Sequence, residues 1–175
     1  MSLDQFDSES ISDRDNSTIY TPTTTSDTFT ADLSEDHDQS SGVPSHDSTF
    51  IIRSVSSGHV ITLLDGQVVL APPGGRGSIH WACVETKGWF GFRNRISNKF
   101  LCHAWNGRLE CSATQHDGWR HFSITPVPKG GYIMQMLDFW TLRPIVINEE
   151  NGLQKLGRTG IKLSDGIIWE FVRIW

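Results

Sequence analysis

Apolar and polar residues alternate in short segments along residues 49–175, and turn residues separate those segments. Clear examples are Phe50-Ile51-Ile52, Trp81-Ala82-Cys83-Val84, Trp89-Phe90-Gly91-Phe92 and Tyr132-Ile133-Met134-Gln135-Met136. Alternation over about four to eight residues is typical of half-buried β-strands. Gly and Pro interrupt every window long enough for a helix. The pattern therefore predicts an all-β domain.

Three tight-turn signals recur along this domain: Asp65-Gly66, Asn106-Gly107 and Asn151-Gly152, spaced by 41 and 45 residues. Asn-Gly and Asp-Gly pairs indicate two-residue β-hairpins. An aromatic residue that begins a strand-like segment follows the three glycines after 15, 15 and 17 residues. We therefore expect three pseudo-repeats of about four strands each. Their approximate ranges are 49–88, 89–130 and 131–175.

Three such repeats resemble a single β-trefoil, in which a closed barrel with a hairpin cap leaves no exposed sheet edge. A β-sandwich needs no three-fold register, and three blades would make an unusually small propeller. Aligning the repeats predicts which side chains form the core. The cysteines take positions that hold large apolar residues in the other repeats, and the strand aromatics match one another. The predicted core residues are Trp81, Cys83, Cys102, Cys111, Phe122 and Trp169.

Buried free cysteine behaves as a small hydrophobic residue, which favours core packing for all three thiols. In a two-residue hairpin Cys102 and Cys111 would face each other, so a disulfide is geometrically conceivable. A reducing cytosol disfavours it. A zinc site would need a Cys-x-x-Cys spacing, which is absent from the sequence.

With these segments in view, the domain resembles the fascin-like branch of the β-trefoils, in particular small fungal members. The resemblance is carried by segments 50–58, 69–81 and 130–132. It implies a trefoil over 49–175 and suggests actin as a partner, although a single module would need a second site or a dimer to crosslink filaments. The Gln-x-Trp signature of ricin-type lectins is not repeated here, and its nearest counterpart is Gln115-His116-Asp117-Gly118-Trp119.

The charge of −5 on the whole chain hides two opposite parts. Residues 1–48 carry eleven acids, one base and 18 Ser or Thr, whereas residues 49–175 carry 14 bases and nine acids. Such a composition predicts a disordered acidic tail. Serines beside acids in the tail suit an acidophilic kinase. The tail is either a plain solvating segment or a screen over a site on the basic domain.

Several function classes are not expected. No run of 18 apolar residues is present, so no membrane span is predicted. The N-terminus does not look like a secretory signal or a transit peptide, so a cytoplasmic location is expected. The basic excess is smaller than is typical of nucleic-acid-binding domains. No serine elbow or metal motif occurs, so no catalytic residue, metal or cofactor is expected.

Candidate binding residues fall into two groups. The first is cationic. Arg76 lies in the glycine-rich loop 72–78, which either cradles an anion or is a long turn. Arg93 and Arg95 lie near the first junction between repeats, where they would form either a solvated face or a contact for an acidic partner such as actin.

The second group is aromatic. Trp105 precedes a turn glycine and Trp119 follows Asp117-Gly118, while His103 and His121 lie close to them in sequence. Exposed indole rings stack on sugars, cations or bases. The alternative is that these rings cover the barrel ends.

We therefore expect a non-catalytic binding module for a macromolecular partner. Carbohydrate binding through exposed tryptophans is the alternative. A third hypothesis is a small-molecule enzyme with its site in the barrel mouth. The oligomeric state stays open.

Overall fold

The computed structural model describes residues 42–174, so residues 1–41, which include most of the predicted acidic tail, and residue 175 lie outside the described part. Residues 42–174 form thirteen strands and two short 3-10 turns, η1 and η2, and no α-helix. The elements follow the three predicted repeats. Repeat one holds β1 (Thr49–Ser54), β2 (Val60–Leu64), β3 (Gln67–Ala71) and β4 (Trp81–Thr86). Repeat two holds β5 (Trp89–Asn94), β6 (Phe100–His103), β7 (Leu109–Ala113), η1 (Gly118–Arg120) and β8 (Phe122–Pro126). Repeat three holds β9 (Tyr132–Asp138), β10 (Thr141–Pro144), β11 (Val146–Glu150), β12 (Leu153–Gly157), η2 (Leu163–Asp165) and β13 (Ile168–Arg173).

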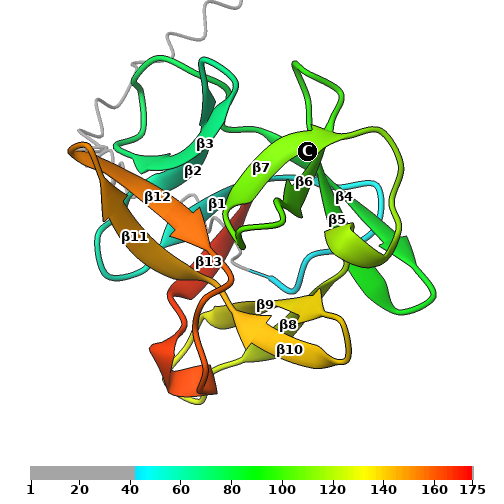
Figure 1. Cartoon of the computed structure of the whole chain (residues 1–175). Helices are drawn as coiled ribbons and strands as arrows, with labels where there is room; N and C mark the ends of the chain where they lie inside the picture. Colours follow the sequence, from blue (N-terminus) through cyan, green and yellow to red (C-terminus); the bar gives the residue numbers. More distant parts are fainter. Residues whose placement is uncertain (1–41, 175) are drawn as a thin grey trace, which may run out of the picture. The chain divides into compact units, whose positions relative to one another are not determined.

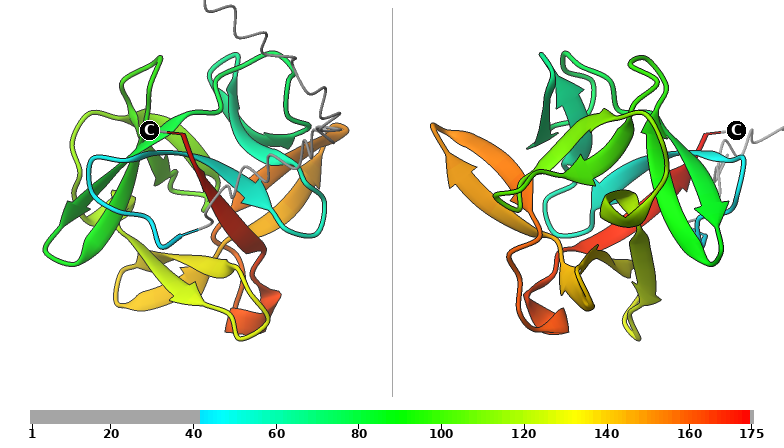
Figure 2. Two further views of the ribbon diagram at one scale, coloured as in Figure 1. Left: turned by 180° about the vertical axis from the view of Figure 1, so that it is seen from behind. Right: turned by 45° about the vertical axis from the view of Figure 1, so that its right-hand side comes forward.

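Six of these strands close into a barrel. Strand β1 pairs with β4, β4 with β5, β5 with β8, β8 with β9, β9 with β13, and β13 again with β1. The closing pair of β1 and β13 is visible in both figures as adjacent cyan and red strands (Figures 1 and 2). Every pairing is antiparallel, and the closed ring leaves no barrel edge unpaired.

The three remaining hairpins, β2–β3, β6–β7 and β11–β12, form the cap of the barrel. Strand β12 pairs with β3 through Lys155 and Val69, so neighbouring hairpins contact each other (Figure 1). A six-stranded barrel with three capping hairpins and a three-fold repeat is a β-trefoil, as the sequence predicts. Strand β10 has no equivalent in the other two repeats.

The core gathers at the barrel axis. Trp81, Phe122 and Trp169 are fully buried at equivalent places in the three repeats. The Trp81 indole Nε1–H donates to the carbonyl of Ile61 at 3.0 Å, which satisfies its polar atom. Phe92 packs edge-on against Phe122, with ring centroids 5.4 Å apart. A fully buried aromatic ring stabilises a fold by about 1.5–3 kcal/mol, so this layer is a main source of stability.

The cysteines do not sit as a two-residue hairpin would place them. Cys83 and Cys102 are buried, Cys111 is half-buried, and all three thiols are free. In the β6–β7 pair, Cys102 lies opposite Glu110, and Cys111 lies opposite Leu101. The expectation that the two cysteines face each other is therefore wrong. The cause is the connecting loop, which is one residue longer than predicted.

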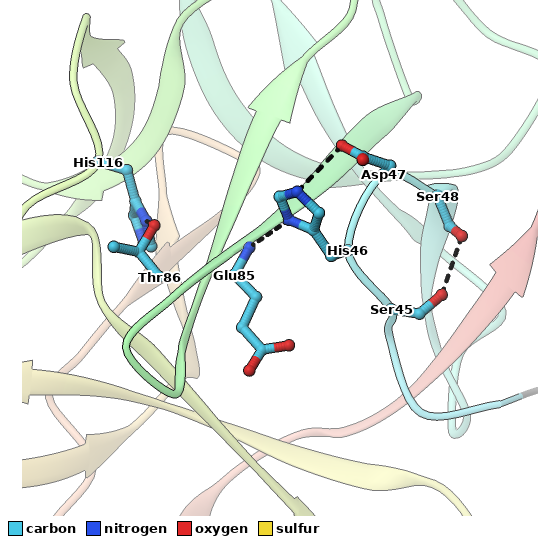
Figure 3. Close-up of polar contacts among 7 residues, drawn as sticks. All are labelled: Ser45, His46, Asp47, Ser48, Glu85, Thr86 and His116. Atoms are coloured by element: carbon cyan, nitrogen blue, oxygen red, sulfur yellow. Dashed lines mark hydrogen bonds and ion pairs between the residues drawn. The ribbon is translucent and has the colours of Figure 1, made fainter.

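The residues that precede β1 are hydrogen-bonded to a barrel strand. The Asp47 N–H donates to the Cys83 carbonyl at 3.1 Å, and the Cys83 N–H donates to the Ser48 carbonyl at 2.8 Å. His46 Nδ1 accepts the Glu85 N–H at 3.0 Å (Figure 3). These bonds attach residues 46–48 to strand β4.

No helix within residues 42–174 is long and apolar enough to cross a membrane. In the same range, no group of three or more His, Cys, Asp or Glu side chains is arranged to hold a metal ion.

Candidate functional site

The turn between β6 and β7 carries the first exposed ring. The Gly107 N–H donates to the Ala104 carbonyl at 2.9 Å, and the Ala104 N–H donates to the Arg108 carbonyl at 2.7 Å. Gly107 has φ +83°, whereas Asn106 does not adopt a positive φ. This is a three-residue loop with glycine in the left-handed position, and not the two-residue turn that Asn-Gly predicts. The extra residue is Trp105, which is 80% exposed at the tip.

The second ring is held by η1. The Arg120 N–H donates to the Asp117 carbonyl at 2.8 Å, and the two side chains form an ion pair. This 3-10 turn presents Trp119, which is about half exposed. The His103 ring stacks on Trp119 with centroids 5.2 Å apart and planes 16° apart. The ring of Trp105 lies 6.3 Å from that of Trp119.

The hairpin β9–β10 supplies the third and fourth rings. Repeats one and two have a single strand pair at the equivalent place, whereas β9 and β10 pair over four residues. Their turn consists of Phe139 and Trp140, which are 72% and 96% exposed. Phe139 has φ +53°, a conformation that a bulky side chain rarely adopts. One strained residue and two exposed aromatic rings at a single turn make this hairpin a candidate functional element.

An ion-pair cluster centred on Asp138 lies next to these rings. Asp138 Oδ2 accepts from Arg143 Nε at 3.0 Å and lies 2.5 Å from Arg158 Nη1. The Asp138 and Arg158 side chains are only 16% and 12% exposed. Burial lowers the pKa of His103, outweighing the Ala104 carbonyl, which raises it. Burial therefore favours the neutral form of the imidazole that stacks on Trp119.

Six residues of this region, without Trp140 and Arg143, line one hollow, which we call the aromatic pocket. Its volume is about 80 Å³. The lining residues are His103, Trp105, Trp119, Asp138, Phe139 and Arg158. The pocket joins repeat two to repeat three, since its first three residues come from β6, the following loop and η1.

The structure brings together three of the seven predicted binding residues: His103, Trp105 and Trp119. Sequence reasoning missed Asp138, Phe139 and Arg158. One signal was present in the sequence, because the strand-like alternation from Tyr132 ends in the adjacent aromatics Phe139 and Trp140. Arg158 had no such signal, because only the fold places it beside Asp138.

His121 lies in a different cluster. Its ring stacks on Trp89 at 5.3 Å and meets His116 edge-on at 5.0 Å. His116 in turn stacks on Phe100. The Arg93 guanidinium lies over the Phe100 ring, 5.9 Å from its centroid. Burial lowers the pKa of both histidines. This row of rings covers the outside of β5 and is separate from the aromatic pocket.

The other cationic candidates also lie outside the pocket. Arg76 is exposed and pairs with Asp65 at 3.3 Å. In its loop, a Cβ on Gly77 would lie 2.8 Å from the Leu63 carbonyl, so this glycine permits the close approach of the loop to β2. That contact favours the long-turn interpretation of the loop. Arg95 is exposed on the β5–β6 loop.

Two further places bear on the enzyme hypothesis. A hollow of about 560 Å³ lies among the cap hairpins. On its lining, Arg108 pairs with Glu150, and Lys155 donates to Gln67. Burial raises the pKa of Cys111, which also lines it, so this thiol is not a ready nucleophile.

The second place is the serine and histidine group near the start of β1. His46 Nε2 lies 3.3 Å from the Asp47 carboxylate, and its Nδ1 already accepts the Glu85 N–H. The Ser45 and Ser48 hydroxyls bond to each other at 2.9 Å and not to the imidazole (Figure 3). The arrangement holds the segment in place and does not activate a serine.

Comparison with known proteins supports the fold. A ricin B-like lectin from Macrolepiota procera, solved in complex with lactose, is 17% identical with a TM-score of 0.56, over 76% of this chain and all of that one. The designed three-fold symmetric protein ThreeFoil is 13% identical with a TM-score of 0.59, over 72% of this chain and 99% of that one. At these identities the likeness concerns the β-trefoil fold alone.

A GH43 β-1,3-galactosidase is 12% identical with a TM-score of 0.61 over 77% of this chain. The chain spans only 28% of that protein's length. No protein-family model matches the sequence. No curated protein matches it either. The fascin-like resemblance therefore stays a prediction.

Proposed function

We propose that this β-trefoil is a carbohydrate-binding module and that the aromatic pocket is its site. The observation that carries the proposal is the placement of exposed rings over a nearly buried carboxylate and guanidinium pair. A sugar ring has an apolar C–H face and a rim of hydroxyl groups. Indole rings stack on the apolar C–H face, and carboxylate and guanidinium groups form strong hydrogen bonds with the hydroxyl groups.

The charge of the site distinguishes a sugar from a cation. Aromatic cages also bind quaternary ammonium groups. Here, however, Asp138 already has two arginine partners, so its negative charge is more than balanced. A cation would meet net repulsion, whereas a neutral polyol would not. The lectin and glycosidase among the similar folds support the proposal by analogy.

The test is a glycan array, followed by fluorescence titration of the full chain with lactose and with each array hit. We expect Trp105→Ala to weaken binding about three- to tenfold, the effect of losing one stacked ring. Trp105→Phe should retain much of the affinity. Arg76→Ala is the matched control, because Arg76 is exposed outside the pocket. Unchanged binding in Trp105→Ala, or no glycan bound by the native chain, would refute the proposal.

We retain fascin-like actin binding as a second proposal, on one observation. Arg95 is exposed on the β5–β6 loop beside Ile96, which is 82% exposed. A cationic and apolar loop tip suits an acidic protein surface. Co-sedimentation with filamentous actin tests it, with Arg95→Glu expected to abolish pelleting. If the native chain stays in the supernatant, the actin proposal fails.

A further inference from the structure

A second hollow lies next to the aromatic pocket. It measures about 240 Å³ and is lined by Gly118, Trp119, Leu137, Phe139 and Trp140. Trp119 and Phe139 line both hollows, so the two are neighbours that share these rings. The proposed function does not involve this second hollow.

The surroundings of Trp119 restrict where a ligand can stack. His103 covers one face of its indole ring. A ligand must therefore use the open face, the ring edge or the neighbouring rings. Trp140 is almost fully exposed at the hairpin tip, so its ring is available to a ligand.

Gly118 is one of the residues that line the second hollow. A Cβ on Gly118 would have no heavy atom within 4 Å, and Gly118 does not have a positive φ. A larger side chain at this lining position would therefore cause neither a clash at Cβ nor backbone strain. Among the residues that line the hollow, none is charged. Its contacts with a ligand are therefore stacking and apolar contacts.

We propose that the second hollow is a subsite for the next unit of an oligosaccharide whose first unit occupies the aromatic pocket. The inference rests on the proposed function and adds the ligand class: a linear saccharide of two or more units. Asp138 and Arg158 recognise the hydroxyl groups of the first unit. Trp140 and Phe139 hold the second unit by its apolar face, so the second unit contributes affinity more than selectivity.

Calorimetric titration with saccharides of increasing length tests this inference. The probes are galactose and lactose, glucose and cellotetraose, and N-acetylglucosamine and chitotetraose. Within the series that the protein binds, we expect the longer saccharide to bind about three- to tenfold more tightly than the monosaccharide. This is the gain in affinity expected from one additional stacking contact.

Two variants separate the subsites. Trp140→Ala removes the exposed ring, and Gly118→Leu adds bulk to the lining of the second hollow. Both variants should abolish the gain in affinity with saccharide length and leave the affinity for the monosaccharide unchanged. Trp105→Ala should weaken monosaccharide and oligosaccharide alike. Near-ultraviolet circular dichroism of each variant confirms that the fold is retained.

The failures of the two proposals are distinguishable. If the length gain persists in Trp140→Ala and Gly118→Leu, the second subsite is refuted while the proposed function stands. If no saccharide binds the native chain, both are refuted. Sedimentation velocity adds a further outcome: a native dimer that Trp140→Ala converts to monomer would show that a second copy of the chain occupies the hollow, and the subsite would be refuted.

Discussion

The positive φ of Phe139 leads to a prediction about the relative stability of two substitutions. An L-residue in the left-handed region costs roughly 1–2 kcal/mol, and Phe139→Ala retains this cost whereas Phe139→Gly removes it. Glycine in turn adds about 0.4–1 kcal/mol of chain entropy to the unfolded state. The net expectation is that Phe139→Gly is more stable than Phe139→Ala by about 0.5–1 kcal/mol. Both lose the same ring, so burial cancels in the comparison.

This order is the reverse of the usual one, because glycine within a regular element is destabilising by roughly 0.5–1 kcal/mol relative to alanine. Trp140 is the matched control, since it lies in the same turn without a positive φ. There the alanine variant should be the more stable one. Urea unfolding of all four variants, fitted with a common slope, measures the differences. If Phe139→Gly is no more stable than Phe139→Ala, strain at this turn is refuted.

Two further predictions concern charge. Asp138→Ala should lower the free energy of unfolding by about 2 kcal/mol, because it leaves two partly buried arginines without their shared carboxylate. The control Arg76→Ala should lower it by less than about 1 kcal/mol, since the Arg76 ion pair is exposed. Equal urea unfolding midpoints for the two variants would contradict this prediction. Burial holds the pKa of His103, His116 and His121 below the ordinary 6.5. The unfolded chain therefore binds more protons below about pH 6.5, and stability should fall between pH 7 and pH 5. A urea midpoint that is constant or rises over this interval would refute that expectation.

Much of the fold could be predicted because local and global signals agree. Asp65-Gly66 and Asn151-Gly152 adopt positive φ at both residues, as two-residue hairpin turns require. Their spacing to the strand aromatics then reveals the three-fold register. Asn106-Gly107 has the same sequence signal but forms a longer loop, in which only the glycine has a positive φ. A dipeptide alone does not distinguish these two turns, and the difference of one residue shifted the expected cysteine register.

The candidate site was only half predictable for a related reason. Trp105 and Trp119 stand beside recognisable turn residues, so their exposure could be inferred. The two central residues of the β9–β10 turn, Phe139 and Trp140, are not usual turn residues, so the sequence does not signal a turn there as an Asn-Gly pair would. Asp138 ends β9, and Arg158 follows the end of β12 twenty residues later, so their contact depends on tertiary packing.

The β9–β10 hairpin is present in only one of the three repeats of the trefoil, and this has a consequence for engineering. At the equivalent positions of the other two repeats, residues 55–59 and 95–99 form loops without an added strand. If the aromatic pocket binds a glycan as proposed, transplanting the hairpin and its supporting residues to these two places would raise the number of sites from one to three. Simultaneous engagement of a branched or surface-bound glycan could then raise overall avidity by about 10²–10⁴ without improving any one contact. Under the proposed function, the presence of this hairpin in one repeat alone would thus set the valency of the protein as well as the place of its site.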